Sequence, residues 1–346
     1  MSIQHKKVVI FGAGAVGGSL AAWMVPHHDQ TYILDKPEVI SRIEEHGLQA
    51  YLEGEKEQTP LVHVKGLSDI TQIDNADIII IAVKNYSLDG VAKLIKDNIK
   101  GDPIIVALQN GIQNQDILPQ YFKKIIYGVV GYNAWLDEPG MVGYQKKGPF
   151  ILGTPDNTLQ EELKEVASYF QLGVETVATD HLQDAAYSKM IINLTNSFTT
   201  LVGHKYREIS EFSLFKKILT NLLYEGVQIV KASGYKECRL GGMPSWRTMT
   251  VVVKLPDFMT NSIFKKNLAK MVLSSMGQDV LQRKGSETEL ESLNGHFIAL
   301  ANKVGHKAPY NRAVYDMCQE KFKEVPFQPI TEEEVWKRIQ IQMKKG

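Results

Sequence analysis

The sequence predicts a two-domain α/β protein, with a parallel sheet in its first half and helices alone in its second half. Three observations predict this division. The first half alternates short apolar runs with helical segments, a pattern typical of parallel strands joined by crossover helices. From about Ser188 onward, apolar residues recur every three or four positions, and few strands are predicted. With 346 residues, the chain also exceeds the usual size of one domain.

The first predicted element is an apolar strand over residues 7–11, and a glycine-rich segment ends it. That segment is Gly12-Ala13-Gly14-Ala15-Val16-Gly17, and residues 18–25 after it are predicted to be helical. This order lets a backbone turn approach a pyrophosphate and present N–H groups at a helix N-terminus. A second strand over residues 31–34 ends at Asp35, where an acidic side chain can accept a hydrogen bond from a ribose hydroxyl. The first half is therefore predicted to be a Rossmann-type, dinucleotide-binding domain.

The other elements of the first half follow in chain order. Residues 37–46 are predicted to form a helix that Gly47 ends. Unbroken apolar runs over 77–83 and 103–108 are typical of strands covered on both faces. Residues 125–130 and 150–152 extend the sheet, 139–149 form a hairpin or loop, and 159–170 form a helix that covers the sheet. We place the boundary of this domain near Thr179, so that it comprises residues 1–179.

Residues 180–325 are predicted to form an all-helical domain. Helical periodicity covers residues 214–232, 265–282, 289–304 and 311–321, whereas 235–259, which contains several Gly and Pro residues, is predicted to be an irregular insertion. Residues 326–346 form a C-terminal extension. In it, Thr331 and Glu334 predict a capping box ahead of a final amphipathic helix.

Composition excludes several classes of function. Lys plus Arg and Asp plus Glu each number 39, so the chain has no net charge that would favour nucleic acid or an anionic membrane. The apolar runs have the length of strands, short of the roughly 20 residues of a membrane span. We expect no secretory leader ahead of the first strand, and Cys238 and Cys318 lack metal-ligand spacing. We expect a cytoplasmic protein without a metal, and we expect His27 and His28 to be a surface pair at a helix end.

Polar residues that follow the core strands are candidates for binding, because ligands of such sheets lie beyond the carboxyl ends of the strands. Lys84 follows one predicted strand and Asn110 follows the next. Each side chain is expected either to contact a bound cofactor or to satisfy backbone groups of its own loop. The residues alone leave both interpretations open.

A polar stripe marks the first helix of the second domain. Lys189, Asn193 and Asn196 stand at positions i, i+4 and i+7, on one face of an otherwise apolar helix. Buried amide and ammonium groups are costly without partners, so the stripe favours a cleft over a hydrated surface. Glu289 allows two interpretations. It is either a candidate for catalysis or the partner of Ser286 in a capping box at the start of a helix. Ser274 and Ser275 also allow both a functional and a structural role, because serine hydroxyls in helices can hydrogen-bond their own backbone.

Taken together, these segments resemble the ketopantoate reductase family, whose members reduce 2-dehydropantoate to pantoate with NADPH on the route to pantothenate and coenzyme A. The resemblance spans roughly residues 7–320. It rests on six motifs in the family's order, which are the 12–17 turn, Val83-Lys84, Gln109-Asn110-Gly111, Lys189 with Asn193, Ser274-Ser275-Met276 with Gln278-Asp279, and Thr288-Glu289-Leu290-Glu291 with Asn294-Gly295. It implies a helical domain like the C-terminal domain of 6-phosphogluconate dehydrogenase, with the active site between the two domains.

The resemblance also implies roles for single residues. Lys189 is the general acid at the ketone oxygen, and Glu289 lies beside the substrate carbonyl. Asn193 and Ser275 hold the substrate, whereas Lys84 and Asn110 contact the cofactor near the nicotinamide. The second asparagine of the family falls at Ser197, with Asn196 beside it, so both are candidates for substrate binding.

Cofactor and substrate stay open within this resemblance. Lys36 stands where NADP(H)-dependent members place a basic residue, whereas Asp35 before it favours NAD(H). We expect NADP(H), with NAD(H) as the alternative. The expected partner is a small 2-keto acid, with a homodimer as a further alternative. The segment around Trp246 is expected to pack in the core, although covering the cleft or forming a dimer contact stays open. Another branched 2-keto or opine-type acid, or a nucleotide sensor without turnover, are the alternative functions.

Overall fold

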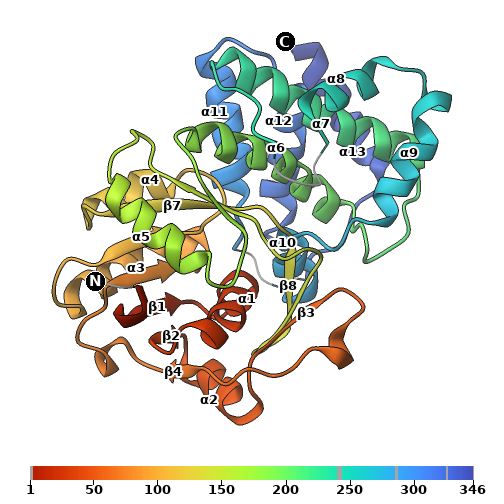
Figure 1. Ribbon diagram of the computed structural model, residues 1–346. Helices are drawn as coiled ribbons and strands as arrows, with labels where there is room; N and C mark the ends of the chain where they lie inside the picture. Colours follow the sequence, from red (N-terminus) through yellow and green to blue (C-terminus); the bar gives the residue numbers. More distant parts are fainter. Residues whose placement is uncertain (1–2, 240–243, 285–286, 325, 346) are drawn as a thin grey trace. The chain divides into compact units, whose positions relative to one another are not determined.

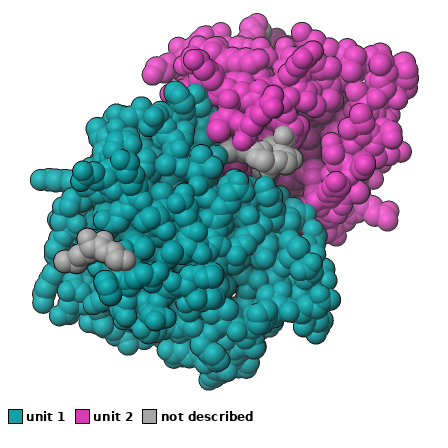
Figure 2. Space-filling model, viewed as in Figure 1, with its two compact units in different colours: residues 1–186 teal, residues 187–346 magenta. Residues whose placement is uncertain are grey.

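The computed structural model describes residues 3–239, 244–284, 287–324 and 326–345. The chain divides into two compact units, Met1–Ala186 and Tyr187–Gly346, which Figure 2 colours separately. Helix α6 (Leu182–Leu201) begins in the first unit and continues in the second. Each unit is described below by itself.

An eight-stranded sheet forms the centre of the first unit (Figure 1). Its strand order is β11-β10-β7-β6-β5-β1-β2-β4, and every neighbouring pair is parallel except β7 and β10. The strands are β1 (Val8–Phe11), β2 (Thr31–Leu34), β4 (Lys65–Leu67), β5 (Ile78–Ile81), β6 (Ile104–Ala107), β7 (Ile125–Val130), β10 (Phe150–Gly153) and β11 (Thr176–Ala178). The register pairs Phe11 with both Leu34 and Ile81, so β1, β2 and β5 end side by side.

A second, three-stranded sheet lies in the same unit. It pairs β3 (Gln49–Leu52) with β9 (Met141–Tyr144) in parallel, and β9 with β8 (Ala134–Glu138) antiparallel. The predicted hairpin or loop at 139–149 therefore contains β9, and the hairpin turns at Gly140, whose φ is +87°. Strand β3 was not predicted, because its partner lies about 90 residues away in the sequence and its own pattern is too short to identify it.

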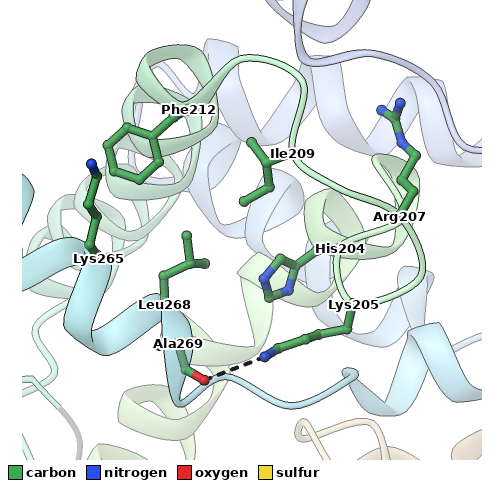
Figure 3. Close-up of a pocket in the computed structure, with 8 residues that line it drawn as sticks. All are labelled: His204, Lys205, Arg207, Ile209, Phe212, Lys265, Leu268 and Ala269. Atoms are coloured by element: carbon green, nitrogen blue, oxygen red, sulfur yellow. Dashed lines mark hydrogen bonds between the residues drawn. The ribbon is translucent and has the colours of Figure 1, made fainter.

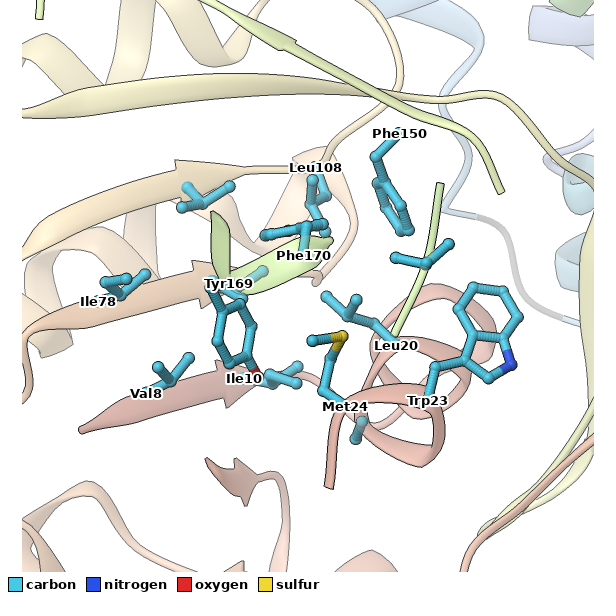
Figure 4. Close-up of a cluster of buried hydrophobic side chains, with 14 of the residues drawn as sticks. Val8, Ile10, Leu20, Trp23, Met24, Ile78, Leu108, Phe150, Tyr169 and Phe170 are labelled. Carbon is cyan, nitrogen blue, oxygen red and sulfur yellow. The ribbon is translucent and has the colours of Figure 1, made fainter. Parts of the chain in front are cut away.

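Among the described residues of the first unit, five α-helices precede α6. They are α1 (Ala15–Met24), α2 (Pro37–His46), α3 (Asn85–Asn98), α4 (Asn114–Ile117) and α5 (Gln160–Phe170). Figure 4 shows how Ile10 and Ile78 of the sheet meet Met24 of α1 and Tyr169 of α5 in the main core. The predicted strands and helices of this half are confirmed to within a few residues, because they depend on apolar runs that are buried on both faces.

His28 corrects one expectation. It is buried, with 1% of its surface exposed, and its ring nitrogens lie 2.9 Å from the Thr31 hydroxyl and 2.9 Å from the Ile3 carbonyl. His27 beside it is exposed. The prediction of a surface pair was therefore wrong for His28, which links the N-terminal turn to β2.

The second unit is helical. After α6 it contains α7 (Phe212–Ala232), α8 (Trp246–Lys254), α9 (Asp257–Ala269), α10 (Ser275–Gly277), α11 (His296–Lys303), α12 (Pro309–Lys321) and α13 (Glu332–Lys345), with π-helical turns at Gln278–Gln282 and Glu291–Gly295. Its core includes Phe215 of α7, Cys318 of α12 and Ile339 of α13. Thr331 and Glu334 form the predicted capping box, since each side chain accepts a hydrogen bond from the other residue's backbone N–H.

Two predictions for this half were wrong. Residues 265–282 do not form one helix, because α9 ends at Ala269 and the Ser274 hydroxyl accepts a hydrogen bond from the Gly277 N–H, which starts a new turn. The segment 235–259 is not irregular throughout, because Ser245 caps α8 and Pro256 precedes α9. Residues 240–243 of that segment lie outside the described residues.

The architecture confirms the predicted fold class, a Rossmann-type α/β domain followed by an all-α domain. None of the described helices combines the length and the apolar character that crossing a membrane requires.

Candidate active site

The glycine-rich turn of the first unit lies between β1 and α1. Its three glycines differ in their backbone conformation and in the space around them. Gly12 has a φ of +108°, which side chains rarely tolerate. A Cβ on Gly17 would lie 1.8 Å from the Gly12 carbonyl oxygen, so this position requires close contact between turn and helix. A Cβ on Gly14 would meet no heavy atom within 4 Å. Gly14 thus leaves open space at the N-terminus of α1, where the backbone of Ala13, Ala15 and Val16 also lies.

Asp35 lies directly against this turn. One carboxylate oxygen accepts a hydrogen bond of 2.6 Å from the Ala13 N–H, and the other accepts one of 2.7 Å from the Lys36 N–H. The Asp35 side chain is half-buried, whereas Lys36 is exposed at the start of α2. The Asp35 carboxylate therefore lies next to the N-terminus of α1, and Lys36 follows it in the chain.

The loops after β5 and β6 bring Lys84 and Asn110 to the same edge of the sheet. Asn85 donates a hydrogen bond of 2.6 Å to the Asn110 carbonyl, and Gln109 donates to the carbonyls of Ile81 and Val83. A Cβ on Gly12 would lie 3.1 Å from Val83, so these loops also adjoin the glycine turn. Lys84 and Asn110 are both half-buried. The buried amides of Asn85 and Gln109 hold the two loops in place through these hydrogen bonds. The sequence did not predict this role, although Gln109 belongs to one of the six family motifs.

In the second unit, α6 carries Lys189 into a buried position opposite Glu289. Lys189 exposes 8% of its surface and Glu289 exposes 4%. Burial lowers the pKa of Lys189 from 10.5 to about 8, and the opposing charge of Glu289 limits that fall. No described residue hydrogen-bonds the Lys189 ammonium. Lys189 is therefore a buried acid whose pKa of about 8 is closer to neutral pH than that of an ordinary lysine, as general acid catalysis favours.

At the start of the Glu289 segment, the Thr288 hydroxyl accepts a hydrogen bond of 3.3 Å from the Leu290 N–H. Ser286, the other half of the predicted capping box, lies outside the described residues. The capping box therefore stays a prediction, and the charge of Glu289 acts to raise the pKa of Lys189.

The rest of the α6 stripe divides into two kinds of residue. Asn193 is buried and Asn196 is half-buried, and no described residue hydrogen-bonds either side-chain amide. Ser197, in contrast, is fully buried and donates its hydroxyl to the Leu194 carbonyl at 2.9 Å. Of the two candidates at the family's second asparagine, Asn196 is thus the one whose polar group is available.

Ser274 and Ser275 are also different from each other. Ser274 caps α10 and lies 3.2 Å from the Thr200 hydroxyl of α6, so its oxygen is already used. Ser275 is half-buried with no hydrogen bond to its hydroxyl from the described residues. Two π-helical turns, Gln278–Gln282 and Glu291–Gly295, follow these serines and Glu289 in the chain. Such turns are frequent at functional sites.

The residues of the first unit fit a dinucleotide. The unfilled space at Gly14, the helix N-terminus behind it and the acid at Asp35 are the three features that a bound pyrophosphate and ribose require. Among the described residues, no cluster of three or more His, Cys, Asp or Glu side chains is arranged to hold a metal ion.

Comparisons with known proteins agree with this architecture. The family model described as Ketopantoate reductase PanE/ApbA matches residues 8–157, and the model of its C-terminal domain matches residues 181–322. The 2-dehydropantoate 2-reductase of Pyrococcus abyssi is 25% identical over 317 residues, which cover 91% of this chain and 97% of that protein. The enzyme of the same name from Pyrococcus horikoshii is 26% identical over 320 residues, with coverage of 91% and 97%.

Two solved structures show the same fold. A ketopantoate reductase from Ralstonia eutropha JMP134 has a TM-score of 0.72 at 20% identity and covers 92% of this chain and 99% of its own. D-mandelate dehydrogenase with NADH and anilino(oxo)acetate has a TM-score of 0.74 at 21% identity, with coverage of 93% and 99%. Because the two family models match in order over most of its length, this chain belongs to the ketopantoate reductase family of oxidoreductases.

Proposed function

We propose that the protein reduces 2-dehydropantoate to (R)-pantoate with a reduced nicotinamide nucleotide, a step of pantothenate and coenzyme A synthesis. The observation that carries the proposal is the buried Lys189 opposite Glu289, on a helix whose Asn193 and Asn196 amides have no hydrogen-bond partner among the described residues. Family membership supplies the reaction class. The curated relatives from Pyrococcus carry the name of this reductase.

Lys189 acts at the ketone oxygen. When bound, the reduced nicotinamide supplies a hydride to the carbonyl carbon, which builds negative charge on the oxygen. An ammonium at that oxygen stabilises the charge and then gives up a proton. With a pKa of about 8, Lys189 is mostly protonated at pH 7 and is a stronger acid than an ordinary lysine.

Glu289, Asn193 and Ser275 support this step. The Glu289 carboxylate favours the charged form of Lys189 and thereby keeps the proton available. The Asn193 amide can both donate and accept, which suits a substrate with hydroxyl and carboxylate groups. Ser275 offers a hydroxyl donor, and Asn196 is the remaining amide along α6.

The substrate is a small 2-keto acid, and the alternative is another branched 2-keto acid or an opine-type acid. The alternative is favoured by one observation: D-mandelate dehydrogenase, crystallised with NADH and anilino(oxo)acetate, shares this fold. A panel of 2-keto acids, followed at the nicotinamide absorbance, distinguishes them. We expect the highest kcat/KM with 2-dehydropantoate, and a tenfold preference for another keto acid would overturn the substrate assignment.

The nucleotide is proposed to bind at residues 12–17, with Lys84 and Asn110 beside the nicotinamide. NADP(H) follows from the family and from Lys36, whose exposed ammonium suits a 2′-phosphate. A specific observation favours NAD(H) as the second candidate, since the Asp35 carboxylate lies within 2.6 Å of the turn and would repel that phosphate. Dissociation constants for both reduced nucleotides decide between them.

A nucleotide sensor without turnover is the remaining alternative. It predicts that NADPH or NADH binds while no keto acid of the panel oxidises it. The buried Lys189 and Glu289 argue against a sensor, because burying a charged pair is costly and a sensor has no use for its acid. We also propose a cytoplasmic location, because neither Cys238 nor Cys318 forms a disulfide, with no nucleic-acid or membrane partner. A homodimer is a further proposal that sedimentation would test.

A further inference from the structure

The second unit contains a cavity of about 380 Å³ beyond the C-terminal end of α6 (Figure 3). The turn after α6, the loop that leads to α7, and the last turns of α9 form its walls. Lys189 lies about 18 Å along α6 from Leu201, at a rise of about 1.5 Å per residue. The cavity is therefore separate from the proposed catalytic lysine, and its lining includes none of the candidate site residues described above.

The cavity has a polar side and an apolar side. Figure 3 shows His204 and Lys205 on one side and the side chains of Phe212 and Leu268 facing them from the other. Phe212 and Leu268 are both half-buried, and Ile209 adds to the apolar wall. A ligand that fills this space would need a polar end and an apolar body.

His204 is a buried group without a partner. It exposes 7% of its surface, and no described residue hydrogen-bonds its ring nitrogens. Burial, together with the charge of Lys205, lowers the pKa of His204 to about 4, so the ring is neutral at pH 7. A neutral imidazole carries one N–H donor and one acceptor. Because neither ring nitrogen is among the fully buried polar atoms, both open onto the pocket and can hydrogen-bond a molecule bound there.

The charge around the cavity is positive. The Lys205 ammonium lies 3.4 Å from the Ala269 carbonyl, and the Lys265 ammonium lies 5.1 Å from the centre of the Phe212 ring. Neither lysine forms an ion pair with a described carboxylate. Arg207 differs, because its guanidinium donates to the Val202 and Ile330 carbonyls and is turned away from the space. The two acids of the same loop, Glu208 and Glu211, do not line the cavity.

We propose that this cavity is a binding site for a small organic carboxylate with an apolar body. The carboxylate accepts a hydrogen bond from the His204 ring and lies close to the Lys205 ammonium. The body packs between Phe212 and Leu268. The pocket is open to solvent, and its volume is at the lower end of the roughly 300–1,000 Å³ of small-molecule sites. The proposal is independent of the reductase assignment.

Calorimetric titration of the full chain with hexanoate tests the proposal. We expect one site per chain with a dissociation constant on the order of a millimolar, given the small size of the ligand. Hexanamide has the same body without the charge and should bind at least about tenfold more weakly, because a hydrogen bond to an ionised group is the stronger kind. Equal affinity for hexanoate and hexanamide would overturn the proposal.

Matched variants locate the site. Lys205→Gln should weaken hexanoate binding about tenfold, whereas Lys266→Gln should not, because Lys266 is exposed on α9 and does not line the cavity. His204→Phe keeps the ring and removes its N–H, and Leu268→Trp fills the space, so both should abolish binding in protein that unfolds at the unaltered temperature. If either variant is unfolded, Lys205→Gln alone decides. Lys189→Met should bind hexanoate normally, and loss of binding in that variant would place the ligand at the catalytic lysine and overturn the proposal.

Discussion

The Lys189–Glu289 pair predicts a specific change in the pH dependence of reduction when its carboxylate is removed. If Lys189 must be protonated, kcat/KM falls above a pKa of about 8. One pH unit above that value, only about one tenth of the enzyme carries the proton, so the rate falls about tenfold for each further unit.

Glu289→Gln removes the charge that holds this pKa up. Losing a nearby opposite charge lowers a lysine pKa by about one unit. From these two values, the defect of the variant is about 1.1-fold at pH 6, about fivefold at pH 8 and about ninefold at pH 9. The loss should therefore grow with pH rather than be constant.

The assay is a pH–rate profile of kcat/KM for 2-dehydropantoate, taken from pH 6 to pH 10 with nicotinamide absorbance as the readout. Glu287→Gln is the matched control, because Glu287 is exposed two positions away and should leave the alkaline limb unchanged. A wild-type profile without an alkaline fall, or a Glu289→Gln limb that coincides with it, would refute the reasoning.

Three further predictions concern the cofactor and stability. Asp35→Ala should tighten NADPH binding about tenfold because it removes a carboxylate from the turn, and unchanged affinity in a fluorescence titration would exclude Asp35 from cofactor choice. Burial raises the pKa of Glu225 from 4.5 to about 7, although its carboxylate accepts hydrogen bonds from the backbone N–H groups of Tyr310 and Asn311. The folded state therefore binds the Glu225 proton more tightly than the unfolded state does. The free energy of unfolding should therefore fall by about 3 kcal/mol in total as pH rises from about 4.5 to about 7, and Glu225→Gln should flatten that slope in urea titrations. Lys216, 3% exposed, donates to Asp257, Thr260 and Asn261, so Lys216→Met should cost about 2 kcal/mol and speed proteolysis at α9; an unchanged cleavage rate would contradict this anchoring role.

The first half was predictable because its strands are covered on both faces. Such strands are unbroken apolar runs, and the residue that follows each run is placed at the carboxyl edge by the parallel register. Asp35 and the loops of Lys84 and Asn110 adjoin the glycine turn for that reason. The β3 strand was missed because its pairing with β9 depends on contacts distant in sequence.

The second half was harder, because helical periodicity does not show where a helix is interrupted. Apolar spacing continues through Lys270–Ser274, although α9 ends at Ala269. The Ser274 hydroxyl then caps α10, which begins a new helical turn. The π-helical turns at Gln278–Gln282 and Glu291–Gly295 change the helical period locally, and apolar spacing does not reveal them. Asn196 and Ser197 show the same limit at single-residue scale, since one step along a helix rotates a side chain by about 100°.

The central claim, that the Lys189 ammonium supplies the proton in the reduction, is tested most directly by Lys189→Met. We predict that kcat with 2-dehydropantoate falls by about 10²- to 10⁴-fold while the dissociation constant of the reduced nucleotide changes less than about twofold. A variant that folds, binds the nucleotide and retains a kcat within about threefold of the wild type would contradict the account.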